Sequence, residues 1–367
     1  MLESKTILSI SPFVTRPLLH GSVTRIYNIN RHLAQKNRIL FVYRDEGPDS
    51  APDFPARPIP NAQPRMSQIF SPSLIHQVNR IAREQPIDLI LANHLWSGIH
   101  AVALRSLLHV PLIFDNHNVE YLRFQKMASR AWPVVWLLER FVSRRADIMQ
   151  CVSPVDKASL QKSMGIPAQR IRVIENGVDV DEFMNAQIDT ADFRRALGVE
   201  PSGVLILFYG SLTYKPNHDA AHILVEEIAP RLARMGIHGE ILIIGNGELS
   251  VPPQSREGSL RFRHLGFVPD LHGYIRSADV IAAPLTAGSG TRLKILESIA
   301  SERAVVTTSI GAEGLNWAAC APFLTVRDEW DSFAEAVYTA LSGPAGRLSG
   351  DFVSTYDWGN IVQRISL

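Results

Sequence analysis

The sequence predicts an α/β fold with two doubly wound parallel sheets, one in each half of the chain. Short continuous apolar runs alternate with helical patterns, and the same alternation starts again after the middle of the chain. Continuous apolar runs are typical of strands that helices cover on both faces, as in a parallel sheet. A chain of 367 residues is also too long for one ordinary hydrophobic core, so two domains are expected.

The strands expected in the first half are the apolar runs at residues 6–11, 38–43, 87–93, 111–116 and 147–153. Helices are expected between them near residues 22–35, 73–84, 97–108, 132–146 and 154–164. The proline-rich stretch 44–72 shows little apolar periodicity. It is therefore expected to be an irregular surface loop.

The strands expected in the second half are residues 203–210, 239–245, 260–268, 278–284 and 303–308. Helices are expected near residues 217–235, 270–277, 290–302 and 328–342, and the connection between the two halves near 176–200. Ligands of open parallel sheets bind where strands end and helices begin. The loops at the carboxyl ends of these strands are therefore the candidates for chemistry.

Composition excludes several classes of protein. No run of 18 or more apolar residues is present, so no membrane-spanning helix is expected. The start of the chain reads as a first buried strand rather than as a signal peptide. Cys151 and Cys320 are the only cysteines, and they lie far apart in the sequence. Two such residues cannot form a disulfide framework or a cysteine metal site. This cysteine usage fits a reducing cytoplasm.

Charge is unevenly distributed along the chain. Residues 1–185 hold 22 Lys and Arg against 16 Asp and Glu, which gives +6, and residues 186–367 hold 15 against 20, which gives −5. A basic first half suggests an anionic partner, such as a phospholipid surface or a phosphate-bearing acceptor, although chance alone can produce such an imbalance.

The stretch "PLTAGSGTRLKILE" joins a strand to a helix and predicts an anion site. Gly288 and Gly290 allow the backbone to approach a ligand closely, and the helix start offers unpaired N–H groups. Arg292 and Lys294 add positive charge, which suits a phosphate or diphosphate. Glu297 lies one turn later, where a carboxylate can accept hydrogen bonds from two neighbouring hydroxyls, as on a ribose. The alternative is an ordinary helix with a surface Lys294–Glu297 pair.

Two further strand ends in the second half are candidates. In "FYGSLTYKPNHDA", Gly210 and Ser211 can expose backbone N–H groups and Lys215 can reach an anion, although a plain strand–turn–helix corner explains the glycine equally. In "LGFVPDL", Phe267 and Val268 can offer a flat apolar surface to a nucleobase, or can simply end a strand.

The first half offers two such loops and one unusual helix. Gly21 and Ser22 follow the first strand, with Ser22 expected as an N-cap, and His117 follows "PLIFDN" in a polar cluster. Hydrogen bonding to a neighbouring loop is the alternative role for that histidine. The segment 130–145 places tryptophans four residues apart between arginines; a core helix is favoured there over a membrane-surface helix.

These segments resemble the GT-B glycosyltransferases of the large group-one type, family four. The resemblance is strong over residues 204–315, weak over 1–110, and includes "FDNHNVE" as a histidine loop and "IENGVDVDEF" as a domain connector. It implies two Rossmann-like domains that face each other across a cleft. The expected parts are an acceptor domain at 1–185, a nucleotide-sugar donor domain at 186–350 and a C-terminal crossover helix at 351–367 that packs on the first domain.

The resemblance also assigns roles to single residues. His117 matches the catalytic histidine near the donor sugar, and Glu297 matches the glutamate that binds the ribose. The expected diphosphate-binding residues are Gly210, Ser211, Lys215, Gly290, Thr291, Arg292 and Lys294. The other expected site residues are Phe267 and Val268 for the nucleobase, His20, Gly21 and Ser22 for the glycine loop of the first domain, and Gly288 and Ser289 for the donor sugar.

Two positions depart from the family pattern. Ser289 stands where many members carry a second glutamate, and Ser211 stands where many carry an arginine, with the following lysine displaced to Lys215. These changes leave a nucleotide site plausible and the identity of the sugar open.

The implied function is a retaining transfer of a sugar from a nucleotide-diphosphate sugar to a hydroxyl of a glycan or lipid-linked acceptor, with no cofactor and no essential metal. The expected partners are a UDP-, GDP- or ADP-sugar and a carbohydrate or polyprenyl-linked acceptor. A cytoplasmic protein is expected, with peripheral contact to an anionic membrane surface kept open and no nucleic acid. The alternatives are a non-catalytic nucleotide-sugar-binding partner of another transferase and a GT-B-shaped sugar-nucleotide epimerase.

Overall fold

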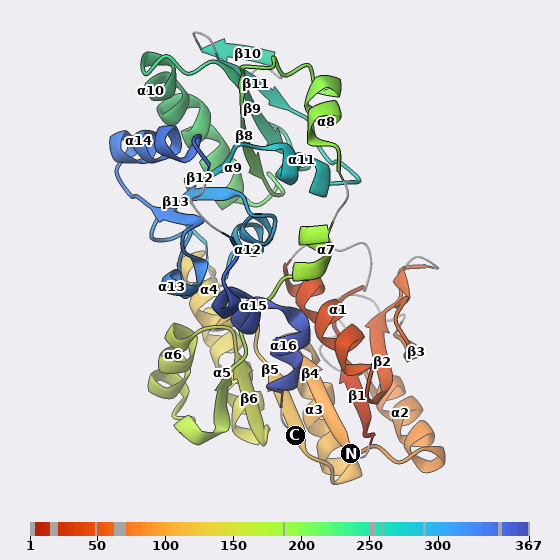
Figure 1. The fold of residues 1–367 in the computed structure, drawn as a ribbon. Coiled ribbons are helices and arrows are strands. Elements are labelled where there is room, and N and C mark those ends of the chain that lie inside the picture. The colour runs from red at the N-terminus through yellow and green to blue at the C-terminus, as the bar shows by residue number, and fades with distance from the viewer. Residues whose placement is uncertain are drawn as a thin grey trace. The chain divides into compact units, whose positions relative to one another are not determined.

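The computed structural model describes residues 4–14, 21–47, 50–61, 71–185, 188–249, 254–257, 260–288, 291–343 and 347–365. Contacts within the chain divide it into two compact units (Figure 1). Unit 1 comprises residues 1–176 and 358–367, and unit 2 comprises residues 177–357. The division therefore falls after Asn176, whereas the sequence-based division falls after residue 185.

Unit 1 contains a parallel sheet with the strand order β3-β2-β1-β4-β5-β6-β7. The strands are β1 (Thr6–Ile10), β2 (Arg38–Arg44), β3 (Arg57–Asn61), β4 (Leu89–Asn93), β5 (Leu112–Asp115), β6 (Ile148–Cys151) and β7 (Ile171–Val173). The helices are α1 (Gly21–Leu33), α2 (Pro72–Glu84), η3 (Leu95–Ser97), α3 (Gly98–Leu108), α4 (Glu120–Lys126), α5 (Trp132–Arg145), α6 (Pro154–Met164), η4 (Ala168–Arg170) and α16 (Trp358–Gln363).

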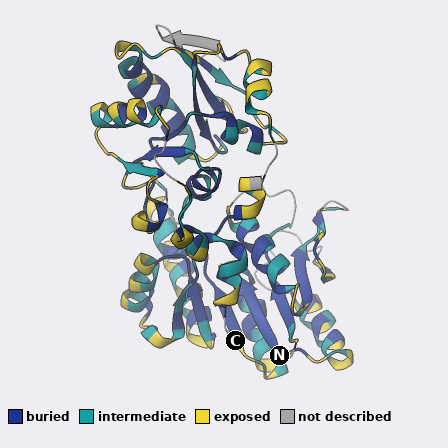
Figure 2. Cartoon of the chain, in the orientation of Figure 1, coloured by how far each residue is buried: buried dark blue, intermediate teal, exposed yellow. Residues whose placement is uncertain are grey.

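Helices cover both faces of this sheet. Alternate residues of β1 therefore pack in two different cores. Leu8 and Ile10 pack in the core that α2, α3, α5 and α6 complete. Ile7 packs in the opposite core with Ile26 of α1 and Trp358 of α16, which contacts α1. The central strands β1, β2, β4, β5 and β6 are accordingly mostly buried (Figure 2). The doubly wound architecture and the return of the C-terminal helix to the first domain are thus confirmed.

Unit 2 repeats the architecture with the strand order β10-β11-β9-β8-β12-β13-β14, in which β10 alone of the described strands pairs antiparallel. The strands are β8 (Val204–Tyr209), β9 (Gly239–Ile244), β10 (Gln254–Glu257), β11 (Leu260–His264), β12 (Val280–Ala283), β13 (Ala304–Thr307) and β14 (Leu324–Val326). The helices are α7 (Val180–Asn185), α8 (Thr190–Ala196), α9 (Lys215–Ile223), η5 (Leu224–Ile228), α10 (Ala229–Arg234), α11 (His272–Ser277), α12 (Leu293–Ala300), α13 (Trp317–Cys320), α14 (Trp330–Ala340) and α15 (Gly350–Tyr356).

The expectation of an irregular loop at residues 44–72 is wrong in part, since β3 lies inside it. Ile59 is buried, and Pro58 and Pro60 on either side of it are exposed. Alternate residues of a strand direct their N–H groups to the same side, so both prolines can place their missing donors away from β2. The sequence pattern did not predict this edge strand, because two of its five residues are prolines and only one is a buried apolar residue.

Two helical predictions differ in detail. The helix expected at 217–235 is interrupted by the π-helical turn η5, because the ring of Pro230 removes a donor and clashes with the carbonyl four residues earlier. The closing segment 351–367 is split between the units. Phe352 and Tyr356 of α15 are buried in unit 2, and only α16 belongs to unit 1.

Among the described residues, no helix combines the length and the apolar character needed to cross a membrane.

Candidate active site

Gly210 directly follows β8 and lies against residues of α9 and α12. Lys294 Nζ donates a hydrogen bond to Asn217 Oδ1 at 2.7 Å and lies 4.4 Å from the centre of the Phe208 ring. A Cβ atom at position 210 would lie 2.7 Å from Lys294 Nζ, and the φ of Gly210 is 142°. Only glycine therefore fits beneath this lysine. Burial lowers the pKa of Lys294 to about 7, helped by the nearby Arg292 and opposed by Glu297.

Glu297 is held by a tyrosine at the end of β8. The Tyr209 hydroxyl lies 3.1 Å from Glu297 Oε2, 2.6 Å from the Lys294 carbonyl oxygen and 3.1 Å from Ser298 Oγ. Burial raises the pKa of Glu297, and the hydrogen bond from Tyr209 opposes this rise. Because Lys294 bonds to Asn217 and Glu297 to Tyr209, the two residues do not form the surface pair considered as the alternative.

The start of α12 presents polar groups beside the N–H groups that a helix leaves unpaired. Thr291 is 9% exposed and its Oγ1 atom has no hydrogen-bond partner. Arg292 is the N-cap residue, and a Cβ atom on Gly288 would lie 3.1 Å from its Nη2 atom. Ser289 and Gly290 lie outside the described residues. The helix start thus combines a guanidinium with a buried, unsatisfied hydroxyl.

Other expected residues of unit 2 do not join this cluster. Lys215 is 83% exposed and pairs with Asp219 at 2.6 Å. The Ser211 hydroxyl forms a hydrogen bond with Thr213 Oγ1 at 2.8 Å. Phe267 is 69% exposed, and Val268 packs against the core of unit 2. Phe267 is therefore exposed, and Lys294 rather than Lys215 lies against Gly210.

Unit 1 contains a buried ion pair that holds His117. Arg25 of α1 donates from Nε and Nη2 to the two carboxylate oxygens of Asp115 at 2.9 and 2.7 Å. Its Nη1 atom donates to the Glu175 carbonyl and to Asn176 Oδ1. His117 Nε2 lies 3.0 Å from Asp115 Oδ2. The ring is therefore fixed by a carboxylate that is itself fixed by arginine.

This arrangement sets the protonation state of the histidine. Burial lowers the pKa of His117 to about 4 despite the opposing charge of Asp115. Burial alone would raise the pKa of Asp115, but Arg25 and His117 outweigh it and hold that pKa well below its usual range. A neutral ring that donates from Nε2 has a lone pair on Nδ1, and His117 Nδ1 is buried without a partner.

A second carboxylate orders the loop around this histidine. Glu139 of α5 accepts hydrogen bonds from Asn116 Nδ2 and from the backbone N–H groups of Glu120 and Tyr121, at 2.9, 3.1 and 3.0 Å. Burial raises the pKa of Glu139 to about 7. The His94 ring packs edge-on against His117, with their centres 5.5 Å apart. Both ends of the loop are thus tied to neighbouring elements.

The glycine loop of the first domain is only partly described. Helix α1 begins at Gly21, so Ser22 lies inside its first turn rather than capping it. His20 lies outside the described residues.

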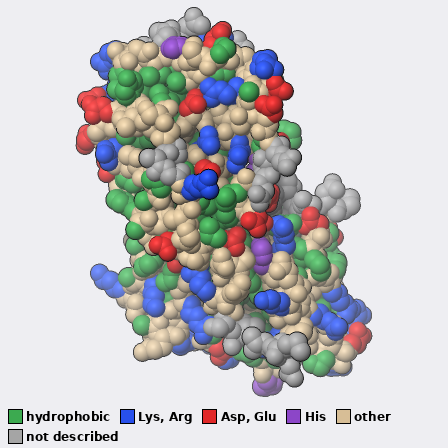
Figure 3. Space-filling view, viewed as in Figure 1, with side chains coloured by type: hydrophobic (Ala, Val, Ile, Leu, Met, Phe, Trp, Pro, Cys, Tyr) green, Lys and Arg blue, Asp and Glu red, His purple; other side chains and the backbone are tan. Residues whose placement is uncertain are grey.

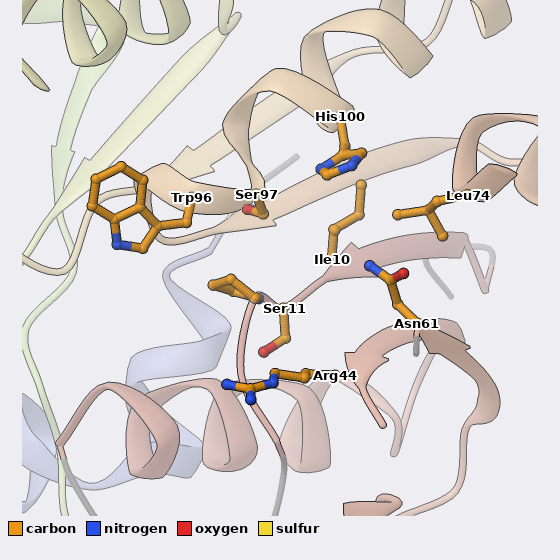
Figure 4. Close-up of a pocket in the computed structure, with 9 residues that line it drawn as sticks. Ile10, Ser11, Arg44, Asn61, Leu74, Trp96, Ser97 and His100 are labelled. Carbon is orange, nitrogen blue, oxygen red and sulfur yellow. The ribbon is translucent and has the colours of Figure 1, made fainter. Parts of the chain in front are cut away.

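A pocket lies at the carboxyl ends of β1 to β4 in unit 1. Figure 4 shows Arg44 and His100 on opposite sides of it, with Ser11 and Asn61 between them and Trp96 at one end. The His100 ring accepts a hydrogen bond from the Ser71 N–H at 2.7 Å. The pocket thus offers a guanidinium and hydroxyl and amide groups.

Sequence reasoning missed Arg25, Tyr209 and Asn217. Tyr209 is the last residue of an apolar strand, and Asn217 lies in the first turn of a helix, so each had a positional signal. Arg25 had none, because an arginine on a surface helix looks ordinary. Among the described residues, no group of three or more His, Cys, Asp or Glu is placed to hold a metal; metal independence stays a prediction.

We expect Arg25→Met to destabilise unit 1 by about 3–5 kcal/mol, because it leaves the Asp115 carboxylate buried without its cation. Thermal and urea unfolding of the purified protein measure this loss. Asp115 has a depressed pKa in the folded state, so the pair contributes stability above the unfolded pKa of about 4 and loses it as the pH falls below that value. The difference between variant and wild type should therefore shrink at acidic pH.

The matched control is Arg105→Met, whose partner Asp147 forms a half-exposed pair at 2.7 Å and should cost less than about 1 kcal/mol. Adding Asp115→Asn to Arg25→Met should restore part of the stability. Equal losses for both arginine variants would contradict the assigned role.

Comparisons with known proteins identify the family of the chain. The family model described as "Glycosyltransferase Family 4" matches residues 19–182, and the model "Glycosyl transferases group 1" matches residues 203–343. A phosphatidyl-myo-inositol mannosyltransferase from Mycolicibacterium smegmatis is 31% identical over 204 residues, covering 52% of this chain and 50% of that protein. An uncharacterized glycosyltransferase from Methanocaldococcus jannaschii is 26% identical over 61% of this chain and 58% of its own length. The chain thus spans less than two thirds of these curated relatives.

Two solved structures share the fold over nearly the full chain. HepE from Anabaena, in complex with UDP and glucose, is 18% identical, covers 98% of both chains and has a TM-score of 0.70. Sucrose-phosphate synthase from Thermosynechococcus elongatus is also 18% identical, covers 98% of this chain and 97% of its own, and has a TM-score of 0.72. The two family models together span most of the chain, and the protein belongs to the GT-B glycosyltransferases of the group-one type, family 4.

Proposed function

We propose that the protein transfers a sugar from a nucleoside-diphosphate sugar to a hydroxyl of a glycan or lipid-linked acceptor, with retained configuration and without an essential metal. Sugar transfer itself follows from the family. The observation that most supports the proposed donor is the cluster at the start of α12. There Lys294, Arg292 and the unpaired Thr291 hydroxyl lie within one turn, followed by Glu297 held by Tyr209.

The cluster suits the departure of a diphosphate. Breaking the bond between the anomeric carbon and its oxygen places negative charge on the leaving phosphate. Preorganised N–H donors and cations stabilise that charge more in the transition state than in the ground state. If configuration is kept, the acceptor oxygen attacks from the face that the phosphate leaves, and the leaving phosphate oxygen can take the acceptor proton. No strong protein base is then required.

The donor class is supported by what related proteins bind. HepE from Anabaena was solved with UDP-glucose, and an Escherichia coli relative that is 22% identical over 266 residues is named a UDP-Gal:alpha-D-GlcNAc-diphosphoundecaprenol alpha-1,3-galactosyltransferase. A polyprenyl-linked acceptor is therefore part of the proposal. The basic first half of the chain supports an acceptor at an anionic membrane surface.

The function is tested by incubating the protein with UDP-, GDP- and ADP-sugars, first in a thermal-shift screen and then with candidate acceptors. Stabilisation by one nucleoside diphosphate and release of that nucleotide with a glycosylated product are the expected results. Binding without turnover on any acceptor would instead favour the non-catalytic partner, for which Ser289 and Ser211 are the motivating departures. Conversion of the donor to its epimer would favour the epimerase.

Glu297→Ala should weaken binding of the nucleoside diphosphate by about 10- to 100-fold, because the ribose loses hydrogen bonds to a charged group. Isothermal titration calorimetry measures the affinity. Glu335→Gln, on the exposed face of α14, is the control and should bind as wild type does. Unchanged affinity in Glu297→Ala would remove this residue from the site.

His117→Ala should lower kcat by about 100-fold, because the Nδ1 lone pair no longer accepts a hydrogen bond from the sugar. Steady-state kinetics with the identified donor measure the loss, and a thermal melt reports whether the variant folds. His76→Ala, on the exposed face of α2, should keep full activity. A folded His117→Ala protein with wild-type turnover would demote this histidine to a structural role.

Donor affinity should fall as the pH rises above 7, because Lys294 has a pKa of about 7 when free and a bound diphosphate keeps it protonated. Affinity should drop up to about tenfold per pH unit between 7.5 and 9, a range in which the donor diphosphate, esterified at both phosphates, stays fully ionised. Lys294→Arg should flatten this dependence, since arginine stays charged. A profile equally steep in both proteins would contradict the assignment.

A further inference from the structure

His94, which directly follows β4, has a backbone conformation that is unusual for any residue other than glycine. Its φ is 70° and its ψ is 156°. This combination is almost confined to glycine, because the Cβ atom of other residues clashes with the backbone. Strained residues of this kind gather at functional sites. No motif in the sequence points to His94, so its strain calls for an explanation.

Hydrogen bonds on both sides hold His94 in this conformation. Its backbone N–H donates to the Asp115 carbonyl oxygen at 2.9 Å. Its own carbonyl oxygen accepts from the Ser97 N–H and from the Ser97 hydroxyl, at 3.3 and 3.0 Å. A strained conformation persists only where its surroundings fix it in this way. The residue after β4 is thus attached to the end of β5, two residues before His117.

The ring of His94 packs against the ring of His117. The two rings are nearly perpendicular, at 84°, and their centres lie 5.5 Å apart. Both residues are only 4% exposed, whereas Figure 3 shows histidine side chains, in purple, at the surface of the molecule. Phe13 packs edge-on against the His94 ring as well, with the centres 5.1 Å apart. A second aromatic ring besides His117 therefore restricts the movement of His94.

A buried carboxylate also fixes the orientation of the His94 ring. His94 Nδ1 accepts a hydrogen bond from the Trp96 N–H at 3.5 Å, so the proton of a neutral ring lies on Nε2. His94 Nε2 lies 3.4 Å from Oε1 of the buried Glu120. Burial alone would raise the pKa of Glu120, but His94 and Arg123 outweigh it and hold that pKa below its usual range. Both nitrogens of the His94 ring thus have partners.

Asp115 and His94 restrict different movements of His117. Asp115 Oδ2 holds one ring atom of His117, Nε2, at 3.0 Å, and a single hydrogen bond leaves a ring able to tilt about it. A perpendicular ring packed against His117 restricts that tilt. The direction of the Nδ1 lone pair depends on the plane of the ring. Both contacts are therefore needed to fix this direction.

We propose that His94 is a positioning residue for sugar transfer, whose ring sets the plane of the His117 ring and thereby the direction of the His117 Nδ1 lone pair. The strained backbone at His94 is retained because a glycine there, although relaxed, would carry no ring. The proposal rests on the proposed function, in which that lone pair accepts a hydrogen bond from the donor sugar.

The first test compares stability with activity in two variants that lack the ring. His94→Gly should melt at a higher temperature than His94→Ala, because only glycine relieves the strain. Both should lower kcat about tenfold and keep the donor KM within about twofold of wild type, because a tilted His117 still leaves the donor bound. Equal melting temperatures together with wild-type kcat would overturn the proposal.

His94→Phe is the conservative variant, since it keeps a ring at this position and loses the contact with Glu120. It should keep kcat within about threefold of wild type, even where it lowers the melting temperature. Should the glycine variant fail to fold, His94→Phe and His94→Ala carry the test. Equal kcat in these two variants would overturn the proposal.

His109→Gly is the matched control. His109 also has a positive φ, 57°, but it is exposed at the end of α3. Glycine is the residue that favours this position after a helix. The variant should therefore melt at or above the wild-type temperature and keep full kcat.

A double-mutant cycle separates positioning from a general structural role. Adding His94→Gly to His117→Ala should change kcat by less than about twofold, because the ring that His94 positions is gone. A structural role would instead produce the same loss in both backgrounds, and that result would overturn the proposal.

A readout without turnover distinguishes failure of this proposal from failure of the proposed function. Nitrogen NMR of protein with isotope-labelled histidine rings reports which ring nitrogen carries the proton, and His117→Ala identifies the His117 signals. In wild type these signals should show a proton on Nε2 and none on Nδ1, and in His94→Gly they should shift or broaden. Unchanged signals with full turnover in His94→Gly would overturn the positioning role and leave the transferase intact. Shifted signals in a protein that turns over no donor would support the ring contact and overturn the proposed function.

Discussion

The buried pair of Arg25 and Asp115 is the interaction on which the position of His117 in unit 1 depends. Neither side chain is exposed by more than 1%. Each charge is therefore compensated by the other rather than by water. The cost of desolvation offsets much of the attraction within such a pair, and losing one partner is costly because an uncompensated charge stays buried. Arg25 also reaches the backbone of Glu175 and the side chain of Asn176. One guanidinium thus joins α1, the end of β5 and the last residues before unit 2, and through Asp115 it decides which nitrogen of His117 is free.

Unit 2 also contains buried charged side chains, and different groups satisfy their hydrogen bonds. Lys294 and Glu297 lie one turn apart on α12, and each is satisfied by a side chain from outside that helix, Asn217 and Tyr209. Buried polar atoms without hydrogen-bond partners are rare in native structures, so each one calls for an explanation. Thr291 Oγ1 in unit 2 and His117 Nδ1 in unit 1 are such atoms. Thr291 lies shortly before α12, in the connection that leaves β12, and His117 lies two residues after β5. Both connections leave the carboxyl end of a parallel strand, where this class of sheet binds its ligands.

The sequence predicted the parts that depend on local pattern. Apolar runs located the buried strands, and glycine followed by a helix start located the cluster of Thr291, Arg292 and Lys294. It failed where a tertiary contact decides the outcome. Lys215 is near Gly210 in sequence, but Asp219 lies one helical turn away and pairs with it, while Lys294, distant in sequence, reaches the glycine. Arg25 gave no signal, since its role comes from a carboxylate 90 residues away in the chain. Strand β3 was missed because two prolines replace apolar residues at an edge.

Helix α5 connects the outer surface of unit 1 to the histidine loop. Its buried face holds that loop through Glu139, whose carboxylate accepts from Asn116 and from the N–H groups of two residues after His117. Its outer face exposes Leu137 and Phe141. Glu139 is thus the side chain through which α5 holds the loop by hydrogen bonds. That carboxylate has its pKa raised to about 7 by burial, so its hydrogen bonds to the loop weaken as it gains a proton.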